Sequence, residues 1–219
     1  KMSLTNSFMS INNHSLNVAT LNLILIEKIS NLYWVSKHKQ QLSQYPYLNN
    51  KIYLRGFLTY TSFGTYCLFL VSLYEVLTNR KMSPELTNYC WSILFSVTSG
   101  YYLYVVPGIL KSIEPRNWFL NILCHGPYFL ISTYKLFLRS PFSIQIDYFD
   151  EIKYCLLYSY GWLFLVWFPW YTFTGDYMYP PLSNKLSKRK RILNILKMSS
   201  LTIFGISGKH LVYKIIKET

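Results

Sequence analysis

Charged residues are scarce in this chain, and acidic residues are the scarcest. Only 14% of the 219 residues are charged, with 9 Asp or Glu against 22 Lys or Arg, so the formal net charge is +13. Soluble domains usually carry about 25% charged residues. The deficit disfavours an ordinary soluble domain. Because the basic residues lie between apolar segments, they favour contact with lipid headgroups over nucleic acid, and no nucleic-acid partner is predicted.

Cysteine pairing and targeting signals are also lacking. Each of the four cysteines (Cys67, Cys90, Cys124 and Cys155) lies in an apolar segment, and none forms a Cys-x-x-Cys pair. This pattern excludes a zinc site or a disulfide framework, and the thiols are expected to pack as small hydrophobic groups. No metal and no cofactor is predicted. The polar start, residues 1–13, does not resemble a cleavable signal peptide.

Long apolar segments dominate what is present. Four of them approach the roughly 20 residues that a membrane-spanning helix needs, and two are weaker. The strong segments are 57–77, 89–110, 118–138 and 154–174, and the weak ones are 15–35 and 192–216. The 21 Tyr and 6 Trp residues suit a membrane–water interface. The sequence therefore predicts an all-α polytopic transmembrane helical bundle of five to six helices, forming a single integral membrane domain over residues 1–219.

One histidine lies well inside an apolar segment. His125 is about two turns into segment 118–138, and Asn121 precedes it by one turn on the same helical face. Asn121 is thus placed to fix the tautomer of the imidazole. Ionisable groups at such positions are usually functional. A hydrogen bond between helices explains an isolated histidine equally well, so both interpretations stay open.

Polar residues near two other segment ends are predicted to lie at the same side of the bundle as His125. Thr59 opens segment 57–77, and residues 174–180 (Thr-Gly-Asp-Tyr-Met-Tyr-Pro) close segment 154–174. The distribution of loop charges places both features on the more basic side. Three separate polar features are thus predicted to converge on one side of the bundle.

Three short stretches resemble one protein family. They are residues 57–60 (Phe-Leu-Thr-Tyr), 119–125 (Phe-Leu-Asn-Ile-Leu-Cys-His) and 174–180. In this order and rough spacing they are similar to stretches of the androgen-induced protein and androgen-dependent TFPI-regulating protein family. The chain departs from the family pattern at Phe119 and Tyr177, where the family has Trp, and at Ile122, where it has His.

The resemblance implies a function and its residues. The family is described as multi-pass membrane threonine hydrolases that cleave fatty acid esters of hydroxy fatty acids. Carried over, Thr59 is the catalytic nucleophile and His125 the base, with Asn121, Thr174, Gly175 and Tyr179 in supporting positions. The chain is then an intramembrane lipid ester hydrolase, and an endoplasmic reticulum or other endomembrane location is expected.

A long acyl chain needs apolar walls around the reacting groups. Aromatic residues that flank the three stretches are the predicted substrate pocket: Phe63, Tyr66, Phe129, Trp170 and Tyr177. The expected partners are membrane lipids, a lipid ester substrate and other membrane protein subunits. The alternative is a non-catalytic transmembrane subunit that anchors a larger membrane or lipid-handling complex. A transporter is disfavoured because neither an inverted repeat nor paired acids within the spans are evident.

Overall fold

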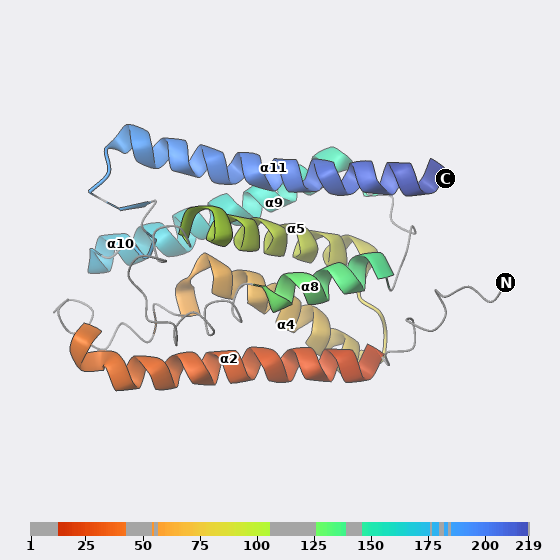
Figure 1. The fold of residues 1–219 in the computed structure, drawn as a ribbon, viewed down its shortest axis with the longest axis horizontal. Coiled ribbons are helices and arrows are strands. Elements are labelled where there is room, and N and C mark those ends of the chain that lie inside the picture. Colours follow the sequence, from red (N-terminus) through yellow and green to blue (C-terminus); the bar gives the residue numbers. More distant parts are fainter. Residues whose placement is uncertain are drawn as a thin grey trace.

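The structure is a computed structural model that describes residues 13–42, 54, 57–105, 126–138, 146–175, 177–179, 182–183 and 185–218. All regular structure in these ranges is helical, and the longest helices run along the long axis of the molecule (Figure 1). In chain order the elements are α2 (Asn13–Leu42), α4 (Tyr60–Thr78), α5 (Pro84–Gly100), the π-helix η1 (Tyr101–Val105), α8 (Pro127–Thr133), η2 (Tyr134–Leu138), α9 (Tyr148–Trp162), η3 (Leu163–Trp167), α10 (Phe168–Thr174) and α11 (Lys188–Glu218).

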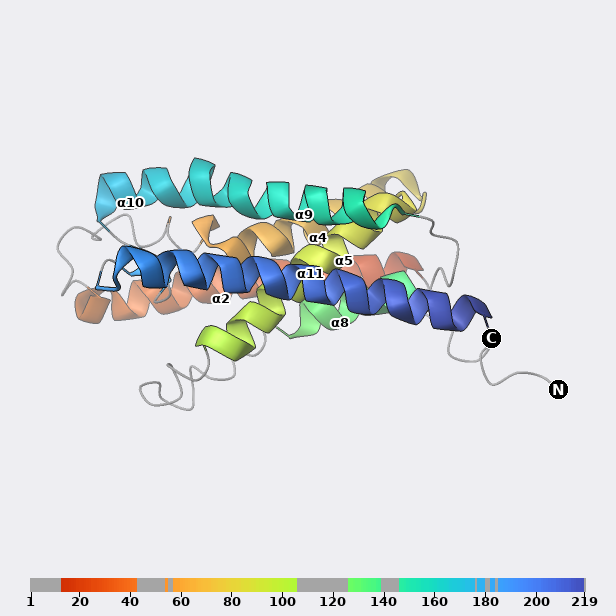
Figure 2. The ribbon, with the colours of Figure 1, turned by 90° about the horizontal axis from the view of Figure 1, so that it is seen from above.

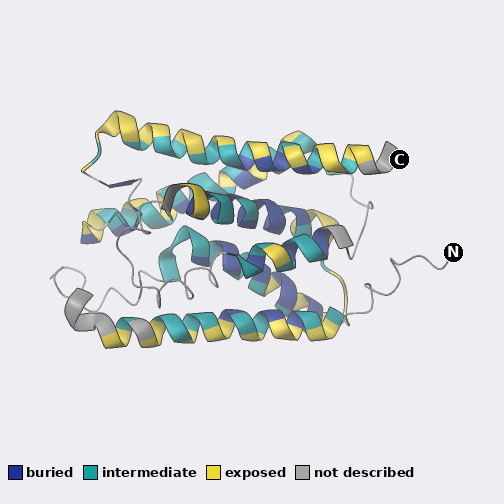
Figure 3. Cartoon of the chain, in the orientation of Figure 1, coloured by how far each residue is buried: buried dark blue, intermediate teal, exposed yellow. Residues whose placement is uncertain are grey.

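Helix α5 is the centre of the bundle. It packs against α4, α8, α9 and α11, while α2 contacts α4 and α11 contacts α9. Consequently α2 and α11 lie on opposite sides of α5 (Figure 1), and α9, η3 and α10 follow one another in a single row (Figure 2). Burial follows this arrangement, since α5 is mostly buried whereas α2 and α11 each keep an exposed face (Figure 3).

Local sequence explains several of the helix ends. Thr59, Ser83 and Asp147 cap the N-termini of α4, α5 and α9, and each side chain accepts a backbone N–H from the first turn. Such caps satisfy donors that have no partner within the helix. At the opposite ends, Asn79 (φ 53°) closes α4 and Gly175 (φ 71°) closes α10 in the left-handed conformation that favours Asn and Gly.

The prediction of a transmembrane bundle is wrong. Within the described ranges, no helix combines the length and the apolar character that crossing a membrane requires. Helices α2 and α11 are long, with 30 and 31 residues, but both carry many polar residues; α5 has 17 residues. Helix α4 has 19 residues, but Ser62, Thr65, Ser72 and Glu75 dilute its apolar sequence. The predicted integral membrane domain and the endoplasmic reticulum or endomembrane location are corrected with it.

The helix boundaries also differ from the predicted segments. The two weak segments, 15–35 and 192–216, form parts of the longest helices, α2 and α11. Segments 57–77 and 154–174 correspond to α4 and to the row α9–η3–α10. Segments 89–110 and 118–138 are described only in part, because residues 106–125 lie outside the described ranges.

The thiols behave as small packing groups where they are described. Cys90 and Cys155 are buried and Cys67 is partly buried, and all three are free thiols. Burial raises the pKa of Cys155 to about 12, so this thiol stays protonated at neutral pH. Cys124 lies outside the described residues.

Candidate functional site

Thr59 belongs to a small polar cluster between α2 and α4. Its hydroxyl donates to Ser62 Oγ over 3.0 Å and accepts the backbone N–H of Ser62 over 3.2 Å. Lys28 Nζ, on α2, donates to the same Ser62 Oγ over 2.9 Å and pairs with Glu27 over 3.2 Å. We call Thr59, Ser62, Lys28 and Glu27 the α4 cluster. In this cluster the partly buried Lys28 ammonium is linked to Thr59 through the Ser62 hydroxyl.

Helix α8 and an aromatic ring complete the surroundings of this cluster. The Tyr128 hydroxyl donates to Glu27 Oε2 over 3.2 Å, and Asn31 donates to Glu27 Oε1 over 2.7 Å. Lys28 Nζ also lies 5.4 Å from the centre of the Tyr66 ring. Glu27 and Lys28 are therefore held in fixed positions by neighbours from three helices.

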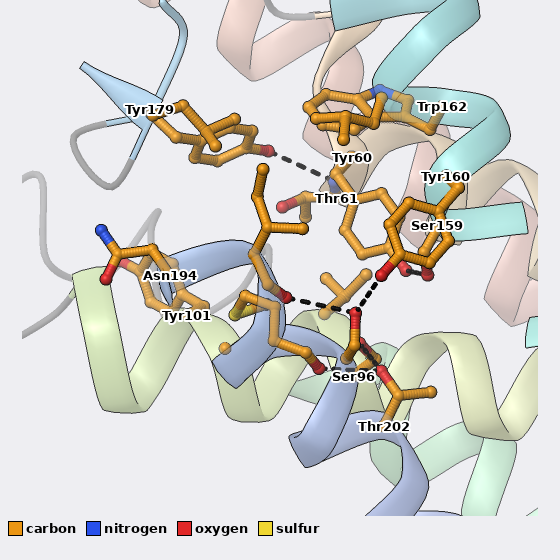
Figure 4. Close-up of a pocket in the computed structure, with 17 residues that line it drawn as sticks. Tyr60, Thr61, Ser96, Tyr101, Ser159, Tyr160, Trp162, Tyr179, Asn194 and Thr202 are labelled. Carbon is orange, nitrogen blue, oxygen red and sulfur yellow. Dashed lines mark hydrogen bonds between the residues drawn. The ribbon is translucent and has the colours of Figure 1, made fainter. Parts of the chain in front are cut away.

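A cavity of about 130 Å³ opens beside the first turn of α4 (Figure 4). Its walls come from α4, α5, η1, α9, η3, α11 and the segment before α11. The lining residues are Tyr60, Thr61, Ser96, Val97, Gly100, Tyr101, Ser159, Tyr160, Trp162, Leu163, Tyr179, Leu182, Asn194, Ile195, Met198, Ser199 and Thr202. No charged side chain is among them. Because Tyr60 and Thr61 directly follow Thr59, the cavity and the α4 cluster share the same helical turn.

The hydroxyl groups of the cavity wall are largely satisfied by one another. Tyr60 Oη lies 2.7 Å from Ser159 Oγ, and Tyr160 Oη lies 3.1 Å from Ser199 Oγ. Thr202 donates to Ser96 over 2.7 Å. Burial raises the pKa of Tyr60 to about 12, so its phenol is neutral at physiological pH. Because these hydroxyl groups are paired and uncharged, the cavity can accept apolar groups.

Two of the π-helices border this cavity. Tyr101 is the first residue of η1 and Leu163 the first residue of η3, and both line the walls. A π-turn inserts an extra residue into a helical turn and is frequent at functional sites. The regular α-helical turns of α5 and α9 therefore end next to the cavity, where η1 and η3 begin.

Tyr179, from the stretch 174–180, contacts the start of α4. The backbone N–H of Thr61 donates to the Tyr179 hydroxyl over 3.4 Å, and Tyr179 lines the cavity (Figure 4). Thr174 is buried and donates to the Trp170 carbonyl, and Gly175 closes α10. These two supporting residues thus shape the end of α10 and do not line the cavity.

The five predicted pocket residues lie near this region but not on the cavity wall. Phe63 and Tyr66 pack against each other, with ring centres 5.7 Å apart, and Phe129 packs against Trp91 near α5. Trp170 is buried in an aromatic cluster with Trp162, and the Tyr177 carbonyl accepts a hydrogen bond from Trp167. None of the five is among the lining residues, so the prediction that they form the pocket wall is not supported by this cavity.

His125 and Asn121 lie outside the described residues. The pairing of Thr59 with His125 therefore stays a prediction. Sequence reasoning gave Lys28 no role in the site, although a lysine in the apolar stretch 15–35 indicates a buried partner. Burying a charge is expensive unless a partner compensates it.

A second polar cluster was also missed, and it joins α5, α9 and α11. Glu151 is fully buried and pairs with Lys209 and with His210, whose Nε2 lies 2.8 Å from Glu151 Oε2. Ser92 donates to Glu151, and Lys209 donates to Asn88 over 2.7 Å. We call these five residues the Glu151 cluster. Burial alone would raise the pKa of Glu151, but the bond from His210 and the charge of Lys209 hold it below its ordinary value.

Neither cluster suits a metal ion. Across the part of the chain that the structure describes, no group of three or more His, Cys, Asp or Glu residues is arranged to hold one. Comparison with known proteins adds no assignment: no protein-family model, no curated protein and no solved structure matches this chain.

Proposed function

We propose that this protein hydrolyses a lipid ester, with Thr59 as the nucleophile and His125 as the base. The observation that carries the proposal is the position of the Thr59 hydroxyl. It sits next to Tyr60 and Thr61 in the first turn of α4, and these two residues line a cavity whose described lining residues carry no charge. Substrate sites typically combine apolar walls with a few placed polar groups.

The proposed reaction proceeds in two steps. Thr59 Oγ1 attacks the ester carbonyl carbon while its proton passes to the imidazole of His125, and the resulting tetrahedral intermediate collapses as the alcohol leaves with that proton. Water then attacks the acyl-threonine ester, gives its proton to the same base and releases the carboxylic acid. Thr59 recovers its proton at the end, so the protein is unchanged.

The α4 cluster supplies the electrostatics for this chemistry. Negative charge developing on Thr59 Oγ1 would meet the N-terminus of the 19-residue helix α4 and the Ser62 backbone N–H, both of which favour an anion. The Lys28 ammonium binds the adjacent Ser62 hydroxyl and adds a positive charge nearby.

The resemblance described above points to the same residues. Residues 57–60 contain the proposed nucleophile, and residues 174–180 contain Tyr179, which accepts a hydrogen bond from Thr61. Tyr179, from one resembling stretch, therefore contacts Thr61, which directly follows another. Residues 119–125, which contain the proposed base, lie outside the described residues.

Hydrolysis of p-nitrophenyl hexanoate by the purified chain tests the proposal. Thr59→Ala is expected to abolish the release of p-nitrophenol above the buffer rate. Thr78→Ala is the matched control, because Thr78 is exposed at the far end of the same helix. Equal rates for the wild type and Thr59→Ala would refute the function.

The rival proposal is a non-catalytic subunit of a larger assembly. Its support is the exposure of large apolar side chains on the row α9–η3–α10, where Leu165 is 79% and Phe173 80% exposed. Contiguous exposed apolar surface usually marks an interaction site. This proposal predicts no turnover of esters by any variant. It also predicts that Leu165→Ser with Phe173→Ser lowers the molar mass of the isolated assembly in light scattering, whereas the exposed pair Thr78→Ala and Thr172→Ala leaves it unchanged.

A further inference from the structure

We propose that the cavity beside α4 is a specificity pocket for a compact, uncharged apolar group about the size of one aromatic ring, and that Met198 sets its size limit. The inference rests on the proposed function only in taking the guest to be part of the ester substrate. Occupation of the cavity by a ring-sized molecule can be measured without any hydrolysis.

The volume of the cavity limits its guest. It measures about 130 Å³. An engineered protein cavity of about 150 Å³ with apolar walls stays dry and binds benzene. A single ring or a short branched chain therefore fills this cavity. A long acyl chain would have to extend beyond its walls.

The chemistry of the walls selects against charge. The lining residues carry hydroxyl, amide and apolar groups only, and the hydroxyl groups of Tyr60, Ser159, Tyr160 and Ser199 are engaged with one another. A carboxylate placed there would lose its hydration without gaining a cation. An uncharged apolar guest loses little hydration free energy when it enters the cavity.

Aromatic rings on one side of the cavity favour a planar guest. The Trp162 ring meets Tyr60 edge to face with centres 5.3 Å apart, and it meets Tyr179 in the same manner at 5.9 Å. Edge-to-face contacts of this kind are favourable between rings. A guest ring would extend an array that already exists (Figure 4).

Met198 and Gly100 face each other across the α5–α11 boundary of the cavity. A Cβ atom at position 100 would lie 2.3 Å from Met198 Cε and 3.0 Å from its Sδ. Glycine is therefore the only residue at position 100 that allows the Met198 side chain to keep its present position. Because methionine side chains are flexible, a larger residue at position 100 would displace Met198, and both residues border the cavity.

Ligand-observed NMR with toluene, and with benzoate as the charged counterpart of similar size, tests the pocket on the purified full chain. Toluene is expected to bind the wild type, and benzoate is not. Gly100→Ala should weaken toluene binding about 10-fold or more, because the displaced methionine overpacks the site. Gly208→Ala is the matched control, since a Cβ there meets no atom within 4 Å.

Two further variants separate loss of the pocket from loss of the fold. Adding Met198→Ala to Gly100→Ala should restore toluene binding by removing the obstructing side chain. Leu163→Phe, on another wall, should weaken binding as Gly100→Ala does. The proposal is overturned if benzoate binds as tightly as toluene, or if Gly100→Ala and Leu163→Phe both bind toluene like the wild type.

The outcome is independent of the proposed hydrolysis. Toluene binding is also measured on Thr59→Asn, which removes the proposed nucleophile but keeps an N-cap next to the cavity residues Tyr60 and Thr61. If no variant hydrolyses esters but binding depends on Gly100, the proposed function fails and the pocket stands. If esters are hydrolysed but toluene binding is absent, the pocket fails and the proposed function stands.

Discussion

The α4 cluster and the Glu151 cluster are built from similar parts but have different surroundings. Each contains a lysine, a glutamate and a serine that join two or more helices. Lys209 is 2% exposed and fully enclosed between α5, α9 and α11, and its carboxylate partner is enclosed with it. Lys28 binds a serine whose other partner, Thr59, is in the turn that borders the cavity.

The comparison teaches that a charged residue in an apolar helix is not by itself a functional site. The Glu151 cluster is satisfied internally and holds three helices in register, so we expect its loss to reduce stability. The α4 cluster lies at the start of α4, next to Tyr60 and Thr61, which line the cavity, so we expect its loss to reduce activity. The predictions below test this division.

The largest expected effect is on activity at Thr59. Thr59→Asn should lower ester hydrolysis by at least about 10³-fold, because loss of a nucleophile typically costs this much or more. Asparagine is also a good N-cap, so α4 should keep its cap. The free energy of unfolding, measured by urea denaturation, should stay within about 1 kcal/mol of the wild type. A large loss of stability would mean that Thr59 is structural.

The next largest effect is on stability at Glu151. Glu151→Ala should destabilise the fold by about 3–5 kcal/mol, because it leaves the Lys209 ammonium buried without its partner. Asp150→Ala is the control, since Asp150 is exposed in the first turn of α9 and should cost less than about 1 kcal/mol. Similar unfolding midpoints for the two variants would contradict the structural role.

Lys28→Met should reduce activity. A hydrogen bond to a charged group contributes roughly 1.5–3 kcal/mol, and losing that amount from the transition state corresponds to a decrease of about 10–100-fold in kcat/KM. Lys37→Met is the control, because Lys37 is an exposed lysine on the same helix. If both variants keep wild-type kcat/KM, the α4 cluster has no part in catalysis.

The smallest effect is a dependence of stability on pH. The pKa of Glu151 is lowered in the folded protein, so its carboxylate stabilises the fold above the unfolded-state value of about 4.3. That contribution is lost as the pH falls through the lower folded-state pKa. Urea unfolding between pH 6 and pH 3, values chosen to bracket this titration, should therefore show a steeper loss in the wild type than in Glu151→Gln. Parallel curves of unfolding free energy against pH for the two proteins would show that the partners of Glu151 do not lower its pKa.

Much of the helical fold could be predicted from the sequence, but the prediction that its helices cross a membrane was wrong. Apolar segments located α4 and the row α9–η3–α10 within a few residues. Segment 15–35 was predicted to be weak because its apolar run is short, and segment 192–216 because Lys197, Lys209 and His210 interrupt it. In the structure Lys209 and His210 pair with Glu151 on another helix, and partners distant in sequence leave no local pattern.

The candidate site was only partly predictable for the same reason. The sequence indicated Thr59 from its position at a segment start, but at a membrane depth that the structure does not support. Its neighbour Ser62 is local, whereas Lys28 is brought near by tertiary packing between α2 and α4. The cavity walls come from parts of the chain as distant as Thr61 and Thr202, so aromatic residues next to the motifs were a poor guide to them.

Labelling with a fluorophosphonate tests the central claim most directly. The reagent forms a covalent bond with an activated hydroxyl group, and peptide mapping by mass spectrometry identifies the residue that carries it. Our account predicts an adduct on Thr59 in the wild type, slower labelling in Lys28→Met, and normal labelling in Lys37→Met. An unlabelled Thr59 in folded protein, or an adduct on another hydroxyl that persists in Thr59→Ala, would contradict it.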